Sequence, residues 1–238
     1  MIKKIILGIF LIAIILPFVN AQETTADPGV TPDSFLWGLD KALDQITLLL
    51  ARSPEAKAAK GLEIAQERLL EVKAMAEENK LESVAKAEDA HSKTLAKVKQ
   101  NIQNIDEDDP EVQIEKEIEI EKKLKDHEDN VKKVREELKV KIKIEGRLTE
   151  DQQAKLDEFL KSLENNANEV EVEIKNKKDK TKIKNKEKTG KSDEEIEKEI
   201  EELEIEKGVL EEELEIDNEL FELEDDDFEL FELDDDFG

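Results

Sequence analysis

The sequence contains no cysteine, no tyrosine, one tryptophan and only two histidines among its 238 residues. Without cysteine the chain cannot form disulfides, thiolate zinc sites, a cysteine nucleophile or a lipid-anchored N-terminal cysteine. Two histidines are too few for a three-histidine metal site. The chain also lacks an Asp-x-Asp-x-Asp-Gly calcium loop and a complete glycine-rich phosphate loop. We therefore predict no catalytic residues, no specific metal site and no cofactor.

The chain also lacks an excess of basic residues. It has 64 acidic and 37 basic residues, which give a formal net charge of -27. Nucleic-acid binding requires a basic surface that neutralises phosphates, and anionic membranes repel an acidic protein. We therefore exclude nucleic acid and anionic membrane surfaces as partners. Carboxylate oxygens suit calcium, so weak multivalent calcium binding remains a further alternative.

The composition that is present favours helices, because 42% of the residues are charged and Glu, Lys, Ala, Leu and Ile dominate. Hydrophobic residues make up 37% of the chain. That share can bury one side of several helices, but it is too small for a large enzyme core with a deep pocket. The sequence therefore predicts a mainly α fold.

Residues 1–21 have the features of a signal peptide. Two lysines precede the apolar run Ile5–Leu16, and Val19-Asn20-Ala21 forms a cleavage site with small residues. The apolar run is shorter than the roughly 20 residues of a membrane-spanning helix. We expect a secreted or extracytoplasmic, envelope-associated protein, with an uncleaved N-terminal membrane anchor as the alternative. Residues 22–30 are expected to be a disordered spacer.

Residues 31–105 contain three amphipathic patterns that predict an antiparallel helical hairpin closed by a third helix. The first pattern comprises Phe35 or Leu36, Leu39, Leu43, Ile46 and Leu50. The second comprises Ala58, Leu62, Ala65, Leu69, Val72 and Ala76. Between them, Ser53 is expected to cap the second helix, with Pro54 at its first position. The third helix is expected from about Lys80 to Ile105, and Trp37 should pack where the first helix meets its neighbours.

Two pieces of this region resemble a known family. They are Pro32-Asp33-Ser34-x-Leu36-Trp37-x-Leu39 and, after the Ser-Pro-Glu turn, Ala65-Gln66-Glu67-Arg68-Leu69. The family is a domain of unknown function that follows signal peptides in archaeal and some bacterial secreted or membrane proteins. The resemblance covers about residues 31–105. It implies a helical, extracytoplasmic domain and supplies no site residues.

Residues 110–145 are predicted to form a long helix that begins at Pro110, after an acidic boundary. Its apolar positions keep heptad spacing, which is typical of a coiled-coil seam. They are Ile120, Leu124, His127, Val131, Val134 and Leu138. Residues 138–144 also alternate in a way that suits a strand, so that end stays open.

Residues 148–207 divide into a helix, a possible small β-hairpin and a last helix. Thr149 and Gln152 form a capping box for a helix that we expect to end near Asn165. Leu-Thr-x-x-Gln is also a motif of periplasmic helical chaperones, which motivates a holdase as the alternative function. Residues 169–186 alternate around a turn-like centre, so they suit a hairpin. Ser192 is expected to cap the last helix.

Residues 208–238 form an acidic tail that we expect to be disordered. From residue 211 to 238, 16 of 28 residues are acidic and none is basic, while four of the eight phenylalanines lie here. Apolar residues interleaved with acidic ones are typical of a segment that folds on a protein partner, and its negative charge favours a basic one. The candidate partner-binding residues are Phe221, Leu223, Phe228, Phe231, Leu233 and Phe237.

His91 and His127 both lie on apolar helix faces. They could form a metal-binding or acid–base pair if their helices align, or they could be ordinary core residues.

The leading functional prediction is a non-enzymatic, extracytoplasmic helical interaction protein. It would use the tail to bind a protein partner, and its helices could self-associate.

Overall fold

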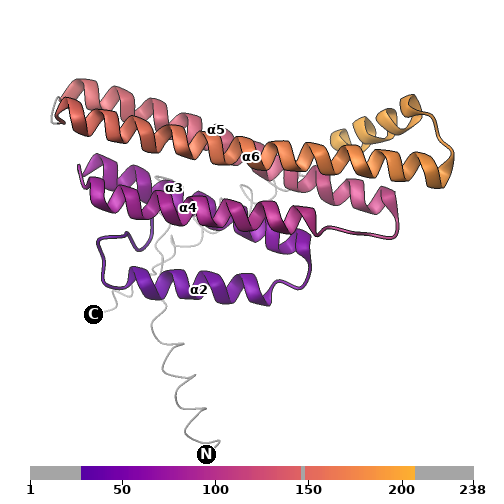
Figure 1. The fold of residues 1–238 in the computed structure, drawn as a ribbon, viewed down its shortest axis with the longest axis horizontal. Helices are drawn as coiled ribbons and strands as arrows, with labels where there is room; N and C mark the ends of the chain where they lie inside the picture. Colours follow the sequence, from indigo (N-terminus) through magenta and orange to yellow (C-terminus); the bar gives the residue numbers. More distant parts are fainter. Residues whose placement is uncertain (1–27, 146–147, 207–238) are drawn as a thin grey trace, which may run out of the picture.

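The computed structural model describes residues 28–145 and 148–206, with the side chains of 143–145 left out. Its helices are α2 (Trp37–Leu50), α3 (Pro54–Glu77), α4 (Leu81–Gln103), α5 (Pro110–Glu145) and α6 (Glu150–Thr189), as Figure 1 shows. Residues 193–206 are also helical. No strand occurs among the described residues. The predicted mainly α class is therefore confirmed.

The local sequence explains where α3 begins and ends. The Ser53 hydroxyl accepts a hydrogen bond from the Ala56 N–H at 3.3 Å, and Pro54 occupies the first helical position, as predicted. At the other end, Asn79 adopts a left-handed conformation with φ of 60°. The Lys80 N–H then reaches the Met75 carbonyl at 2.9 Å, which closes a Schellman turn. This turn reverses the chain directly into α4.

Helices α3, α4, α5 and α6 form a four-helix bundle. Helix α3 packs on α4 and α5, and α6 packs on the same two helices from the opposite corner. Successive helices run in opposite directions (Figure 1). The α3–α4 hairpin lies beside the α5–α6 hairpin, because α3 contacts α5 and α4 contacts α6. The second predicted apolar pattern, from Ala58 to Ala76, is buried as expected. The predicted three-helix unit does not stand alone, because α4 completes its packing against α6.

The bundle core consists of two apolar clusters along its length. The first surrounds the turn between α3 and α4 and includes Leu69, Val72, Met75, Val134, Leu138, Leu156, Leu160 and Leu163. The second lies toward the α4–α5 connection and includes Leu62, Leu95, Val98, Ile102, Ile120, Leu124, Val170 and Ile174. Each cluster draws side chains from all four helices, so no pair of helices has a complete core without the other pair.

The predicted β-hairpin at residues 169–186 is wrong. Helix α6 continues without interruption from Glu150 to Thr189, past the expected end near Asn165. Its buried positions in this stretch are Val170, Ile174, Thr181 and Asn185, at steps of four, seven and four residues. That heptad spacing places them on one side of a helix, facing α4 and α5. The alternative strand at residues 138–144 is also wrong, because α5 runs to Glu145.

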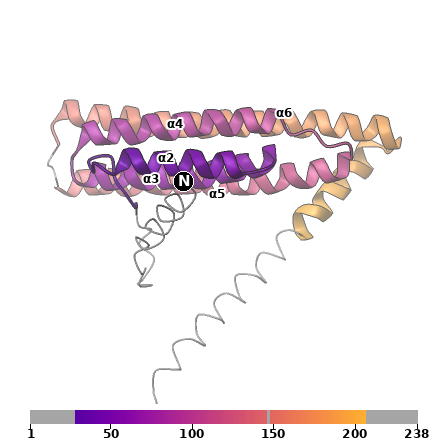
Figure 2. The same ribbon diagram turned by 90° about the horizontal axis from the view of Figure 1, so that it is seen from below.

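Helices α5 and α6 extend beyond the rest of the bundle. They contain 36 and 40 residues, whereas α3 and α4 contain 24 and 23. At about 1.5 Å per residue, α6 is roughly 60 Å long and α4 roughly 35 Å. The helical segment 193–206 folds back against this extension (Figure 2). It packs there through Ile196 and Ile200, which contact Ile114 and Ile118.

Several sequence predictions fall outside the described residues. These are the signal peptide at residues 1–21, most of the spacer at residues 22–30, and the acidic tail at residues 208–238 with all six of its candidate binding residues. Across residues 28–145 and 148–206, no helix combines the length and apolar character needed to cross a membrane.

Candidate functional site on helix α2

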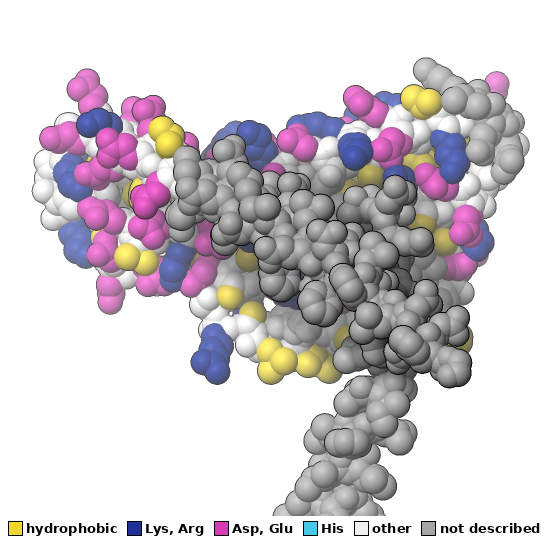
Figure 3. All heavy atoms as spheres, turned by 180° about the vertical axis from the view of Figure 1, so that it is seen from behind, with side chains coloured by type: hydrophobic (Ala, Val, Ile, Leu, Met, Phe, Trp, Pro, Cys, Tyr) yellow, Lys and Arg dark blue, Asp and Glu magenta, His cyan; other side chains and the backbone are white. Residues whose placement is uncertain are grey.

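Helix α2 turns its apolar side toward solvent. The exposed fractions of this row are 44% for Leu36, 60% for Leu39, 53% for Leu43, 50% for Ile46 and 73% for Leu50. We call these five residues the α2 seam. Figure 3 shows hydrophobic side chains gathered over α2 at the lower edge of the molecule. The expectation that this row packs against the next two helices is therefore wrong, and the seam forms an apolar patch of the kind that marks interaction sites.

The opposite side of α2 contacts α3 through polar groups, which we call the α2 latch: Trp37, Asp40, Asp44, Arg68 and Glu71. The Trp37 indole N–H lies 3.0 and 3.1 Å from the two Glu71 carboxylate oxygens. The Arg68 guanidinium donates to Asp40 at 2.7 Å and also to Asp44 and Glu71. Arg68 and Glu71 are each only 1% exposed, so the latch is closed to water at its centre.

The charges around the latch are unbalanced, because one guanidinium forms ion pairs with four carboxylates: those of Asp40, Asp44 and Glu71 and, at 3.7 Å, that of Glu67. Burial raises the pKa of Glu71 to about 8, against the opposing attraction of Arg68. Burial likewise raises the pKa of Asp44 above its usual value, and the neighbouring Asp40 adds to that shift. A buried ion pair loses much of its attraction to the cost of desolvation. The latch therefore determines which side of α2 faces α3, but it stabilises the contact less than apolar side chains of similar size would.

Three lysines border α2 on the side of α4. Lys41 lies on α2 itself, with its ammonium nitrogen 3.5 Å from the centroid of the Trp37 ring. Lys97 of α4 donates a hydrogen bond to the Gln45 side chain, and Lys93 pairs with Asp89 at 2.5 Å. The lysines line a surface recess of about 320 Å³ between the two helices. Asp44 and Arg68 of the latch line the same recess, so these lysines lie on the latch side of α2 and not beside the α2 seam.

His91 and His127 meet at the centre of the bundle, where both are buried. Their Nε2 atoms are 2.9 Å apart, and His127 Nδ1 is 3.2 Å from the Gln66 side-chain oxygen. An N–H at His127 Nδ1 donates to Gln66, so His127 Nε2 accepts from the Nε2–H of His91. Burial lowers the pKa of His91 well below its usual value and that of His127 to about 4. The pair is therefore neutral, and the two Nε2 atoms share one hydrogen bond.

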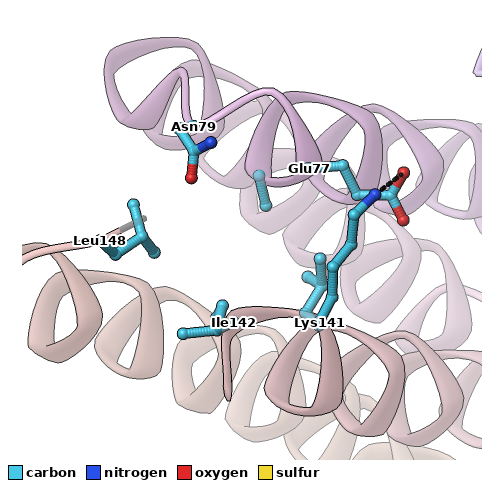
Figure 4. Close-up of a pocket in the computed structure, with 7 residues that line it drawn as sticks. Glu77, Asn79, Lys141, Ile142 and Leu148 are labelled. Atoms are coloured by element: carbon cyan, nitrogen blue, oxygen red, sulfur yellow. Dashed lines mark ion pairs between the residues drawn. The ribbon is translucent and has the colours of Figure 1, made fainter. Parts of the chain in front are cut away.

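Two other recesses lie elsewhere on the bundle, one very small and one shallow. Figure 4 shows a pocket beside Ile142 and Leu148, bordered by the ion pair between Lys141 and Glu77 at 3.1 Å. Its volume of about 10 Å³ is enough for one water molecule. A shallower recess of about 270 Å³ lies beside His127. In the part of the chain that the structure describes, no three His, Asp or Glu side chains are arranged to hold a metal ion.

The latch was not predicted from the sequence, although its signal was present. Arg68 is a charged residue directly beside Leu69 in the second apolar pattern, and such a position requires charged partners once it is buried. Neither spacing nor composition predicts which acidic residues these partners are, because the chain contains 64 of them. Each of the two sequence pieces that carry the family resemblance supplies one latch residue, Trp37 in the first and Arg68 in the second. Both side chains contact Glu71, at the joint between α2 and α3.

Comparison with known proteins agrees with the family resemblance of this region. Residues 29–141 match the family model described as a domain of unknown function (DUF5667). The match extends beyond the predicted 31–105 and includes α2, α3, α4 and nearly all of α5. Neither the curated proteins nor the solved structures yielded a match. The α2 latch and the α2 seam therefore lie within residues 29–141, the part of the chain that is similar to the DUF5667 family.

Proposed function

We propose that this is a non-enzymatic, extracytoplasmic interaction protein that self-associates through the α2 seam. The observation that carries the proposal is the solvent exposure of the five seam residues. The extracytoplasmic location is supported by the signal-peptide features of residues 1–21. The partner that we assign to the seam is a second copy of the same helix.

The spacing of the seam supports a helical partner. Its residues follow one another at steps of three, four, three and four, which is the a/d pattern of a coiled coil. Phe35, Ala42 and Leu49 lie along one edge of the seam, and Asp40 and Thr47 lie along the other. In an antiparallel pair, each edge faces the same edge of the partner. Two copies related by a twofold axis would therefore place apolar edges together, with Asp40 held by Arg68 on the polar side.

The estimated free energy of burying the α2 seam suits a weak, reversible dimer. Full burial of one such side chain stabilises by about 2 kcal/mol, and these side chains are about half exposed, so five of them contribute roughly 5 kcal/mol per copy. Two copies contribute roughly 10 kcal/mol, against a cost of association of about 4–15 kcal/mol. We therefore expect a dimer that dissociates on dilution.

The first prediction concerns the oligomeric state. Sedimentation velocity over a range of concentrations is measured for the mature chain, from Gln22, and for the same chain ending at Lys207, which keeps every described residue. We expect a monomer–dimer equilibrium in the chain ending at Lys207, and a monomer after Leu43→Glu. The substitution places an unpaired charge in the seam of each copy, and Leu43 is already 53% exposed in the monomer, so folding is unaffected.

A matched control is Val172→Glu, because Val172 is 57% exposed and lies on α6, which packs on α4 and α5, whereas α2 packs on α3. This variant should dimerise like the unmodified chain. Circular dichroism of all variants checks that the helices are intact. A monomer at every concentration in the chain ending at Lys207, or equal dimerisation of the Leu43→Glu variant, contradicts the proposal.

The alternative of a holdase chaperone has less support. Its motivating residues, Thr149 and Gln152, form a reciprocal capping box at the start of α6, with the Thr149 N–H 2.9 Å from the Gln152 side-chain oxygen. The motif thus has a structural role in this chain. A holdase would suppress aggregation of a model substrate at near-stoichiometric ratios. Weak multivalent calcium binding stays a further alternative, and calorimetry against a scrambled acidic peptide tests it.

A further inference from the structure

We propose that the extension formed by α5 and α6 carries a groove for an acidic amphipathic helix, and that two copies of the chain can exchange this helix. In one chain the groove is filled by the chain's own segment 193–206, which folds back along the extension (Figure 2). The same segment of a second copy can take its place. The groove is separate from the α2 seam, so this exchange goes beyond the proposed function and does not depend on it.

The apolar part of the groove is a small cluster apart from the two clusters of the bundle. Ile114 and Ile118 of α5 contact Ile196 and Ile200 of the segment, and all four residues are at most 6% exposed. Leu203 packs against the same cluster. The three positions of the segment follow at steps of four and three, which is the spacing of a helix that binds in a groove. Because the cluster includes no residue of α3 or α4, the segment can leave without opening the main core.

The charges of the groove and of the segment are opposite. Residues 175–191 contain nine lysines and two acidic residues, whereas residues 193–206 contain nine acidic residues and one lysine. Lys178 of α6 lies 3.3 Å from the Glu204 carboxylate of the segment, and its side chain is only 12% exposed. Without this basic surface the segment would be held by few contacts, since only two of its residues are fully buried. The groove therefore selects a helix that is both apolar on one side and acidic elsewhere.

The segment follows a glycine hinge and carries its own helix start. Gly190 ends α6 with φ of 73°, a conformation that glycine adopts without strain. Directly after it, the Ser192 N–H donates to the Glu195 carboxylate at 2.8 Å, and the Glu195 N–H donates to the Ser192 hydroxyl at 3.3 Å. This reciprocal cap lies wholly after the hinge, so it moves with the helix. A different turn at Gly190 can therefore place an intact helix on the groove of a neighbouring chain.

A second copy supplies the ligand that the groove already fits. Its segment has the same sequence and makes the same contacts, which is the basis of exchange between identical chains. In a single chain the tether keeps the chain's own segment at a high effective concentration, so the groove is filled from within. A groove whose own segment is disabled is open to the segment of another chain.

The test mixes two mature chains, from Gln22, that both carry Leu43→Glu to remove the contact between α2 seams. One of them also carries Ile118→Asp, which blocks the groove and leaves the segment intact. The other also carries Ile196→Asp and Ile200→Asp, which disable the segment and leave the groove intact. In sedimentation velocity we expect each chain alone to be monomeric and the mixture to form a one-to-one complex.

Two exposed isoleucines provide matched controls. Ile205→Asp replaces the double substitution in the segment, because Ile205 lies in the same segment and is 66% exposed. Ile183→Asp replaces Ile118→Asp, because Ile183 is 59% exposed on α6. A mixture with either control should stay monomeric, since the control chain keeps its segment in its own groove. Circular dichroism checks that the helices of every variant are intact.

A labelled peptide of residues 192–207 gives a second measurement, by fluorescence anisotropy. The chain with Ile196→Asp and Ile200→Asp should bind it at least tenfold more tightly than the chain with an intact segment, and adding Ile118→Asp should abolish binding. Lys178→Glu should weaken binding severalfold, and Glu204→Lys in the peptide should restore it. Added salt should also weaken binding.

The outcomes separate the groove from the α2 seam. A mixture that stays monomeric overturns the exchange between copies. Peptide binding that is equal in the released and intact chains, or unchanged by Ile118→Asp, overturns the groove. Neither result affects the proposed self-association, which is tested by dilution of chains that keep Leu43.

Discussion

At the scale of single residues, the buried pair of His91 and His127 has the clearest consequence. Both rings are neutral in the folded protein, because protonation would place a charge at the centre of the bundle with no carboxylate in contact. In the unfolded chain a histidine has an ordinary pKa of about 6.5. The unfolded state therefore binds protons at mildly acidic pH that the folded state rejects.

The pH dependence of stability follows from this difference. Above pH 6.5 the histidines are neutral in both states and contribute no dependence. As the pH falls from 6.5 toward 4, the pKa of folded His127, the unfolded state gains a proton and the free energy of unfolding decreases. For His127 alone we expect a loss of about 2 kcal/mol between pH 7.5 and pH 5.

Urea unfolding of the unmodified chain and of a His127→Gln variant, each at pH 7.5 and pH 5, measures this effect. Comparing the two chains at each pH cancels the titration of the many carboxylates. The unmodified chain should lose about 2 kcal/mol more than the variant on going to pH 5. An identical pH dependence in both chains would show that His127 has the same pKa in the folded protein as in the unfolded chain.

At the scale of elements, α6 is a single helix, although its sequence from 169 to 186 also suits a β-hairpin. Two of its residues can test which of the two structures forms. In a strand, Val170, Val172 and Ile174 would share one face, whereas in a helix only Val170 and Ile174 face the core. The structure leaves Val172 57% exposed and Ile174 fully buried. The two residues are chemically similar neighbours, so they form a matched pair.

We predict that Ile174→Ala lowers the free energy of unfolding by about 2–5 kcal/mol, because it leaves a cavity among α4, α5 and α6. Val172→Ala should change it by no more than about 0.5 kcal/mol. Denaturant unfolding followed by circular dichroism at 222 nm, the standard helical band, gives both values. Equal losses for the two variants would favour a strand at this position.

The elements also show what the sequence could and could not determine. Caps specify local starts, so Ser53 and Thr149 correctly predicted where α3 and α6 begin. The length of α6 was missed, because Glu and Lys alternating with Val and Ile satisfy a two-residue period as well as a heptad. The orientation of α2 was missed for another reason. Its apolar row predicted a buried side, whereas a buried Arg68 holds the polar side inward.

At the scale of the whole molecule, the family match and the folding unit have different boundaries. The match ends at residue 141, but α6 begins at Glu150 and completes both main core clusters. The α6 residues Leu156, Leu160, Leu163 and Ile174 fill the side of the bundle between α4 and α5. A chain that contains the matched residues alone would expose the apolar sides of those two helices.

We therefore predict that a fragment of residues 28–145 does not unfold cooperatively and binds a dye that reports exposed apolar surface. A fragment of residues 28–206 should show a single cooperative transition, because it contains all described helices. Thermal unfolding followed by circular dichroism compares the two. Cooperative unfolding of the shorter fragment as a monomer would mean that α3, α4 and α5 form a sufficient core by themselves.

The single tryptophan gives the molecule a built-in optical reporter at the joint between α2 and the bundle. Because the chain has no tyrosine, nearly all of its near-ultraviolet emission comes from Trp37. The Trp37 indole donates a hydrogen bond to Glu71, and the Lys41 ammonium lies over its ring. The wavelength and intensity of its fluorescence emission therefore depend on whether α2 is packed against α3. An unlabelled sample can therefore signal the arrival of a partner at α2 while the far larger bundle remains optically silent.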